Sequence, residues 1–122
     1  MFVVLFALAV QSPAMKVNCR QTAHTQLEWN ECSRQNYAVA EHELTVFWRH
    51  MSFKANKYNQ RTFQRLLNGQ RAWLRYRDEN CGWVKDTSTS KTAYFECMEA
   101  VTLQRSEQIR MMAAQFEFRQ GD

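Results

Sequence analysis

The sequence predicts an all-α fold, namely a small antiparallel bundle of three long helices stapled by two local disulfides. Three long stretches each have a mostly apolar stripe at helical spacing, and in the first of them the spacings alternate between three and four. Only three glycines and one proline occur in 122 residues, too few for the frequent turns of a β-sandwich or barrel. Four cysteines form two close pairs, each at the junction of an irregular and a helical stretch.

The first residues predict a leader followed by one domain. Residues 1–10 are apolar without interruption, and residues 11–14 are spaced like a signal-peptidase site, with cleavage after Ala14. No basic residue precedes Lys16, so the usual basic start of a leader is missing. The apolar run is too short to span a membrane, and its alternative interpretation is an N-terminal core helix. We therefore expect a signal-peptide remnant at 1–14, a single helical domain at 15–122, and a periplasmic or secreted location.

The first long helix is predicted to begin at Thr25, because Thr25 and Glu28 match the capping box at a helix start. Its predicted inward stripe consists of Leu27, Asn30, Arg34, Tyr37, Glu41, Leu44, Trp48 and Met51. Residues 52–59 have no apolar period and are predicted to be a linker.

The second long helix is predicted to run from about Gln60 and to end before Gly82, since glycine commonly terminates helices. Residues 86–90 have the composition of a loop. The third long helix is predicted to begin at about Lys91. Its inward stripe consists of Tyr94, Met98, Val101, Arg105, Ile109, Met112 and Phe116.

The cysteines are expected to form disulfides. Four cysteines allow three connectivities, and the sequence alone does not choose among them. Local pairing of Cys19 with Cys32 and of Cys81 with Cys97 is favoured, and each loop of about fifteen residues would contribute roughly 3 kcal/mol. The alternative is a zinc site of cysteines with His24. Because no Cys-x-x-Cys spacing is present, we expect no metal and no other cofactor.

Polar residues also occupy positions where a bundle is usually apolar. Among them, Glu41, Arg77 and Arg105 predict a structural ion-pair network, because a buried charge needs a partner. The set holds no nucleophile, no base near neutrality and no second carboxylate on the same face. We therefore expect no catalytic residues and no enzymatic activity.

Two features of the sequence suggest contact with a partner. Net charge is +4, and every Lys, Arg, Asp or Glu between positions 49 and 77 is basic. Such a run is a solvated face or a site for an anionic partner, and in an exported protein nucleic acid is not expected. Trp83 follows Gly82, outside any predicted helix, and is a candidate binding anchor. The other candidate contact residues are Lys85, Arg71 and Arg75.

Residues throughout the chain match a known pattern. They include the four cysteines, Glu41, and the segment 70–81, which reads QRAWLRYRDENC. The sequence resembles the LprI-like family of small exported bacterial proteins, named for a lysozyme-inhibiting lipoprotein. The family often has Asp and Asn where this chain has Glu41 and Thr45, and a glycine-rich turn at 87–90. No cysteine lies beside the predicted cleavage site to carry a lipid.

The resemblance implies an exported cell-envelope binding protein, with stoichiometric inhibition of a lysozyme-type glycoside hydrolase as the leading hypothesis. The alternative is an envelope protein that binds an anionic cell-wall polymer or a small ligand without inhibiting anything. Charge is an objection to inhibition, because lysozymes are generally basic and a partner of net charge +4 loses long-range attraction. A deep pocket at Glu41, Arg77 and Arg105 would favour a ligand, and a flat helical face a protein partner.

Overall fold

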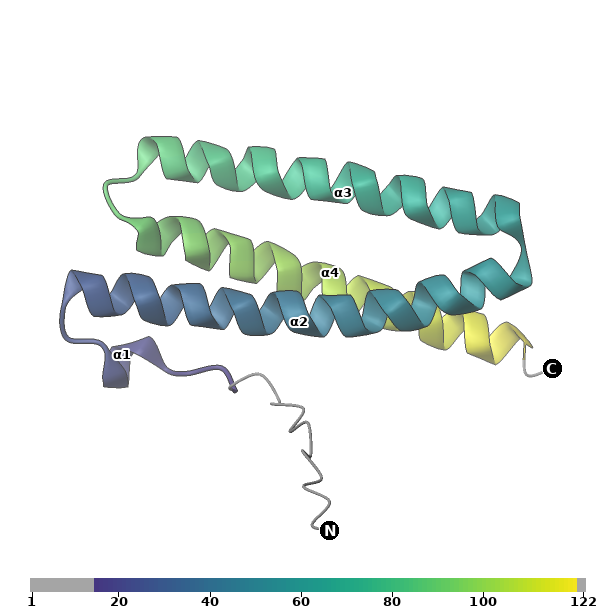
Figure 1. The fold of residues 1–122 in the computed structure, drawn as a ribbon, viewed down its shortest axis with the longest axis horizontal. Coiled ribbons are helices and arrows are strands. Elements are labelled where there is room, and N and C mark those ends of the chain that lie inside the picture. The colour runs from purple at the N-terminus through teal and green to yellow at the C-terminus, as the bar shows by residue number, and fades with distance from the viewer. Residues whose placement is uncertain (1–14, 121–122) are drawn as a thin grey trace, which may run out of the picture.

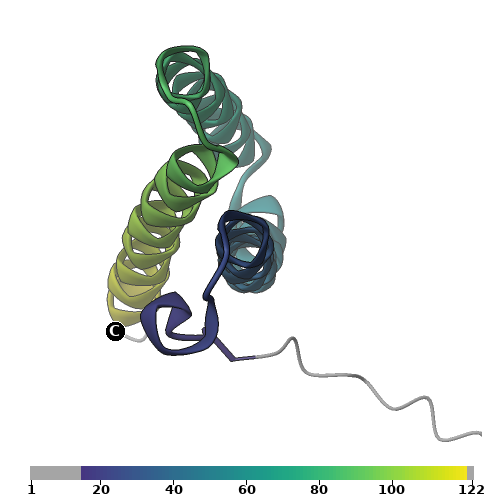
Figure 2. The same cartoon turned by 90° about the vertical axis from the view of Figure 1, so that its left-hand side faces the viewer.

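The computed structural model describes residues 15–120 and folds them into four helices. These are α1 (Cys19–Thr22), α2 (Gln26–Tyr58), α3 (Gln60–Thr87) and α4 (Lys91–Gln120). In Figure 1, α3 runs back along the molecule after α2, and α4 then runs in the direction of α2. Figure 2 shows α1 on the side away from α3. The all-α class is confirmed, with the short α1 added to the three long helices; the predicted leader lies outside the described residues.

The predicted start of α2 is confirmed. Thr25 is the N-cap, and its hydroxyl accepts a hydrogen bond from the Glu28 amide at 3.1 Å. The Glu28 carboxylate accepts from the His24 amide at 2.9 Å. These two bonds satisfy backbone donors that a helix start leaves free, so the local sequence alone fixes where α2 begins.

The predicted linker at residues 52–59 is wrong. α2 continues to Tyr58, and Asn59 is the one residue between α2 and α3. Helix continues because Met51 and Ala55, one turn apart, are both buried, at 6% and 1% exposure. The Asn59 side chain then accepts hydrogen bonds from the amides of Arg61 and Thr62, so it caps the start of α3.

The inward stripe of α2 is also wrong over its first three turns. Leu27 is 78% exposed, and Arg34 lies on the surface in an ion pair with Glu31. The residues buried in this part of α2 are Ser33 and Asn36. Asn36 is buried because it covers the backbone of the N-terminal segment, with which it forms two hydrogen bonds.

The predicted end of α3 before Gly82 is wrong as well. α3 runs through Gly82 and Trp83 to Thr87, so the loop before α4 is reduced to residues 88–90. No described glycine has a positive φ, so Gly82 has an ordinary helical backbone instead of the left-handed one that ends helices. The buried Cys81 and half-buried Val84 continue the inward stripe across this point.

The main core lies toward the α2–α3 turn. Its buried members are Leu44, Met51, Ala55, Leu66, Ile109 and Ala113. The contact between α2 and α4 is the most extensive in the fold. α4 also buries two small polar residues, Thr102 and Ser106, with 0% and 3% exposure. Helix separation follows side-chain size, so small residues such as these permit a close approach of a neighbouring helix.

Replacing Gly82 with alanine is expected to stabilise the protein by about 0.5–1 kcal/mol, since glycine in a helix interior costs roughly that amount relative to alanine. A methyl group built at Gly82 meets no atom within 4 Å, so alanine fits without strain. Gly69, which is equally open, is the matched second site. Urea unfolding measures both variants; a destabilised Gly82→Ala would show that this part of α3 is not the regular helix described here.

Candidate partner-binding site

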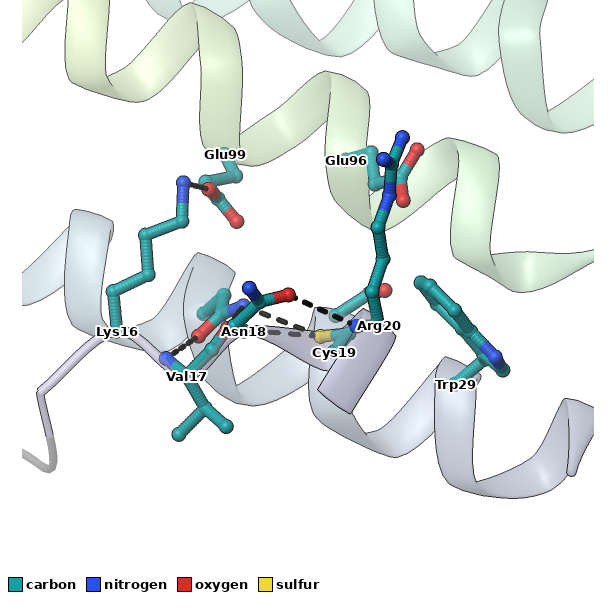
Figure 3. A pocket seen from close by; sticks show the side chains of 10 residues that line it. Lys16, Val17, Asn18, Cys19, Arg20, Trp29, Glu96 and Glu99 are labelled. Carbon is teal, nitrogen blue, oxygen red and sulfur yellow. Dashed lines mark hydrogen bonds and ion pairs between the residues drawn. The ribbon is translucent and has the colours of Figure 1, made fainter. Parts of the chain in front are cut away.

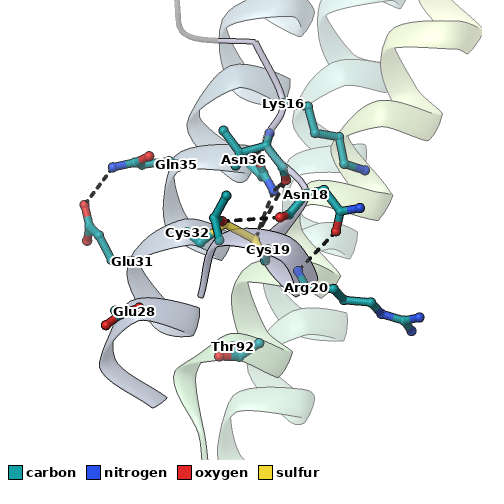
Figure 4. Close-up of a disulfide and its surroundings, with 12 residues drawn as sticks. Lys16, Asn18, Cys19, Arg20, Glu28, Glu31, Cys32, Gln35, Asn36 and Thr92 are labelled. Carbon is teal, nitrogen blue, oxygen red and sulfur yellow. Dashed lines mark hydrogen bonds between the residues drawn. A yellow bond between two sulfur atoms is a disulfide. The ribbon is translucent and has the colours of Figure 1, made fainter. Parts of the chain in front are cut away.

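The first disulfide fastens the N-terminal segment to α2. Cys19 and Cys32 are bonded, with their Cα atoms 5.9 Å apart. Figure 4 shows Asn36 beside this disulfide. Its side-chain amide pairs with the backbone of Val17, donating to the carbonyl and accepting from the amide, both at 2.8 Å. These contacts hold the segment before α1 in a fixed place on α2.

The second disulfide joins the C-terminal part of α3 to the first turns of α4. Cys81 and Cys97 are bonded, with Cα atoms 5.6 Å apart, and Cys81 has 0% exposure. Both bonds join the pairs favoured from the sequence. They leave no free thiol in the described chain for the zinc alternative, and no group of three metal-binding side chains occurs among residues 15–120.

A polar cluster lies between α2, α3 and α4. Arg77 is its buried centre, with 8% of its side chain exposed. Its guanidinium donates to Glu41 of α2 at 2.8 Å and to Asp78 at 3.1 Å. Glu41 is less enclosed than expected from the sequence, because 41% of its side chain is exposed. The ion pair is therefore partly solvated.

Arg105 of α4 belongs to the same cluster through different partners. It donates to Gln70 of α3 at 2.9 Å instead of to Glu41. Trp73 lies between the two arginines, with its ring centroid 5.1 Å from Arg77 and 5.9 Å from Arg105. A guanidinium group is attracted electrostatically to the face of an aromatic ring. The two predicted arginines thus lie against one tryptophan. Arg77 links α3 to Glu41 of α2, and Arg105 links α4 to Gln70 of α3.

Tyr37 borders this cluster and is electrostatically perturbed by it. Burial of the phenol, followed by the nearby Glu41 carboxylate, raises the pKa of Tyr37 to about 12. Both effects disfavour the phenolate. Tyr37 is therefore neutral over the whole physiological range.

A cavity of about 570 Å³ lies between the N-terminal segment, α2 and α4 (Figure 3). Trp29 forms part of its wall, and Lys16 pairs with Glu99 at 2.8 Å across it. Glu96 and Arg20 also line it. This cavity is separate from the polar cluster, since Glu41, Arg77 and Arg105 do not line it.

The most exposed aromatic side chains of α3 lie on its outer face. Trp83 is 69% exposed and Tyr76 is 56% exposed. They are seven residues apart, so they lie two turns apart on one side of the helix. Glu79 and Asp86, four residues before and three after Trp83, are exposed beside it. We call Tyr76, Glu79, Trp83 and Asp86 the Trp83 surface.

The other candidate contact residues lie at different distances from Trp83. Arg75 and Arg71 are exposed on α3, and Arg75 directly precedes Tyr76. Lys85 lies across the helix, with its ammonium 5.5 Å from the Tyr94 ring of α4. The structure therefore groups Trp83 with Tyr76 instead of with Lys85. Tyr76 was not predicted as a contact residue, because its spacing of seven from Trp83 places it on the same face only if α3 continues through Gly82.

The fold and these residues define a disulfide-stabilised, all-α protein with an exposed aromatic surface on one helix. The chain belongs to a family described as lysozyme inhibitor LprI, whose model matches residues 18–109. This match covers both disulfides, the polar cluster and the Trp83 surface. No curated protein and no solved structure matches the chain. The family is one of inhibitors by its description, which agrees with the resemblance seen in the sequence.

No helix in the described part of the chain is long and apolar enough to cross a membrane.

Proposed function

We propose that this protein is exported to the cell envelope and inhibits a lysozyme-type glycoside hydrolase by stoichiometric binding, with the Trp83 surface as its contact. The observation that carries the proposal, together with family membership, is the exposure of Trp83 and Tyr76 at 69% and 56% on one helical face. Tryptophan and tyrosine are the residues most enriched at the energetic centre of protein interfaces.

The disulfide next to this surface supports a binding role. Cys81 lies two residues before Trp83 and is bonded to Cys97 of α4, so the backbone that carries the indole is tied to a second helix. A contact that is already rigid loses little conformational freedom when it binds. The backbone of the Trp83 surface therefore needs no ordering when it binds.

The charges around Trp83 answer the electrostatic objection raised by the net charge of +4. The positive charge is concentrated elsewhere, and the charged residues one turn from Trp83 on its face are the acidic Glu79 and Asp86. Lysozymes are generally basic, so these carboxylates complement such a partner locally. Association then needs no long-range attraction between the two whole molecules.

Inhibition follows from occlusion and requires no chemistry by this chain. A glycoside hydrolase needs its two carboxyl groups to reach the scissile bond, so a protein seated over the cleft excludes the polymer substrate. Arg75, at the edge of the Trp83 surface, is the residue we assign to a carboxylate at the cleft. We assign Arg71 to the rim, where charges mainly affect the association rate. Lys85, across the helix against Tyr94, is left outside the contact.

The test is a cell-wall clearing assay with a panel of lysozymes of different types and increasing amounts of the oxidised protein. We expect at least one lysozyme to lose activity linearly until one equivalent has been added. Full activity across the panel, together with salt-sensitive binding to isolated anionic cell-wall polymer, would refute inhibition and support the polymer alternative.

A further inference from the structure

The end of the molecule opposite the loop between α3 and α4 is strongly basic. It contains the α2–α3 turn and the end of α4, which lie at the same end in Figure 1. We call residues 49–65 and 116–119 the basic tip. Its basic residues are Arg49, Lys54, Lys57, Arg61, Arg65 and Arg119. Its one acidic residue is Glu117, which is paired with Lys54 and lies 3.2 Å from His50.

The basic tip also exposes aromatic side chains. Phe53, Tyr58 and Phe118 are 61%, 55% and 77% exposed. Two of them are held in place, since the Tyr58 ring stands edge-on to Phe116 at 5.3 Å and the Lys57 ammonium lies 4.8 Å from the Phe53 ring. The tip therefore presents cations and large apolar groups together.

We propose that the basic tip docks on an anionic lipid surface. Cations alone would suit any polyanion, whereas three exposed aromatic rings at the same end favour a surface that also has an apolar layer. At a membrane interface, by contrast, aromatic rings enter the headgroup region while lysine and arginine contact anionic headgroups. The pairing of Lys57 with Phe53 provides both contacts from neighbouring side chains.

Docking through the basic tip fixes which way the molecule points. Arg61 and Trp83 are 22 residues apart on one continuous helix, which corresponds to roughly 33 Å at the helical rise. With the tip on the lipid surface, the Trp83 surface extends away from the membrane and stays accessible. Lipid binding and partner binding therefore use different residues and are tested separately.

The test is cosedimentation of the full, oxidised chain with vesicles of phosphatidylcholine containing about one-third phosphatidylglycerol. Lys57→Glu with Arg61→Glu alters the tip, and Arg20→Glu with Lys91→Glu makes the same change in net charge at the other end. Each basic residue near such a surface contributes about fivefold in binding. We expect the tip variant to lose more than tenfold in binding and the control variant less than threefold, with no sedimentation on pure phosphatidylcholine.

A third variant, Phe53→Ser with Phe118→Ser, separates lipid from polymer. We expect it to weaken vesicle binding at unchanged charge and to leave binding to soluble polyphosphate unaltered. Equal losses in the two charge variants would overturn the proposal in favour of a general charge effect. Unchanged vesicle binding by the serine variant would also overturn it, and would assign the tip to a polyanion. Circular dichroism of each variant confirms that it is folded.

Discussion

Removing the disulfide between Cys81 and Cys97 is expected to lower the free energy of unfolding by about 3 kcal/mol. The bond closes a loop across the α3–α4 connection, with a sequence separation of 16, and its loss frees that loop in the unfolded chain. Cys81 is fully buried, so the paired Cys81→Ala, Cys97→Ala variant also leaves unfilled space. Urea denaturation of the wild type and the variant measures the difference.

The matched control is the pair Cys19→Ala, Cys32→Ala. Its loop is of similar length, with a sequence separation of 13, but both cysteines are only half buried. The entropic contribution is therefore nearly the same, and the packing contribution is smaller. A loss below about 1 kcal/mol for the Cys81 and Cys97 pair would contradict the role given to this bond.

Arg77→Ala is expected to destabilise the protein by about 3 kcal/mol, and Glu41→Ala by only about 1 kcal/mol. The asymmetry arises because 8% of the Arg77 side chain is exposed, against 41% for Glu41. Without Arg77, Trp73 loses the guanidinium against its ring. Without Glu41, Arg77 keeps Asp78 as a partner at 3.1 Å.

Two further variants test this interpretation of the polar cluster. Arg77→Met keeps most of the apolar stem, so it separates the loss of packing from the loss of charge. Arg110→Ala, which removes a surface arginine from its pair with Glu107, is expected to leave the urea midpoint unchanged. Equal destabilisation by Glu41→Ala and Arg77→Ala would show that the ion pair is more enclosed than described here.

The features predicted well from sequence are those fixed by local chemistry. Thr25 and Glu28 cap α2 whatever the rest of the chain does, and cysteines close in sequence can bond without a long-range arrangement. The continuation of α2 was missed because Ala55 is too small to mark an apolar stripe, although it is 1% exposed. Gly82 was predicted to end α3, but its neighbour Cys81 is anchored by a disulfide to α4. This anchoring outweighs the cost of glycine in a helix, so α3 continues.

The candidate site was only partly predictable for a related reason. Trp83 is exposed, as a binding anchor must be, but the premise that it lies outside a helix was wrong. Its helical conformation and its pairing with Tyr76 required knowledge of where α3 ends. The burial of Asn36 against the backbone of Val17 is a contact between segments that no helical period encodes. Periodicity finds helices, but it does not identify which face a nonhelical segment will cover.

The most direct test of the binding account is the dissociation rate of the complex with an inhibited lysozyme, measured for Trp83→Ala. A buried aromatic anchor of this kind contributes at least about 2 kcal/mol, so we expect dissociation to accelerate about 30-fold or more with little change in association. Phe118→Ala is the control, because Phe118 is 77% exposed but lies on the basic tip. Equal dissociation rates for Trp83→Ala and the wild type would contradict the account.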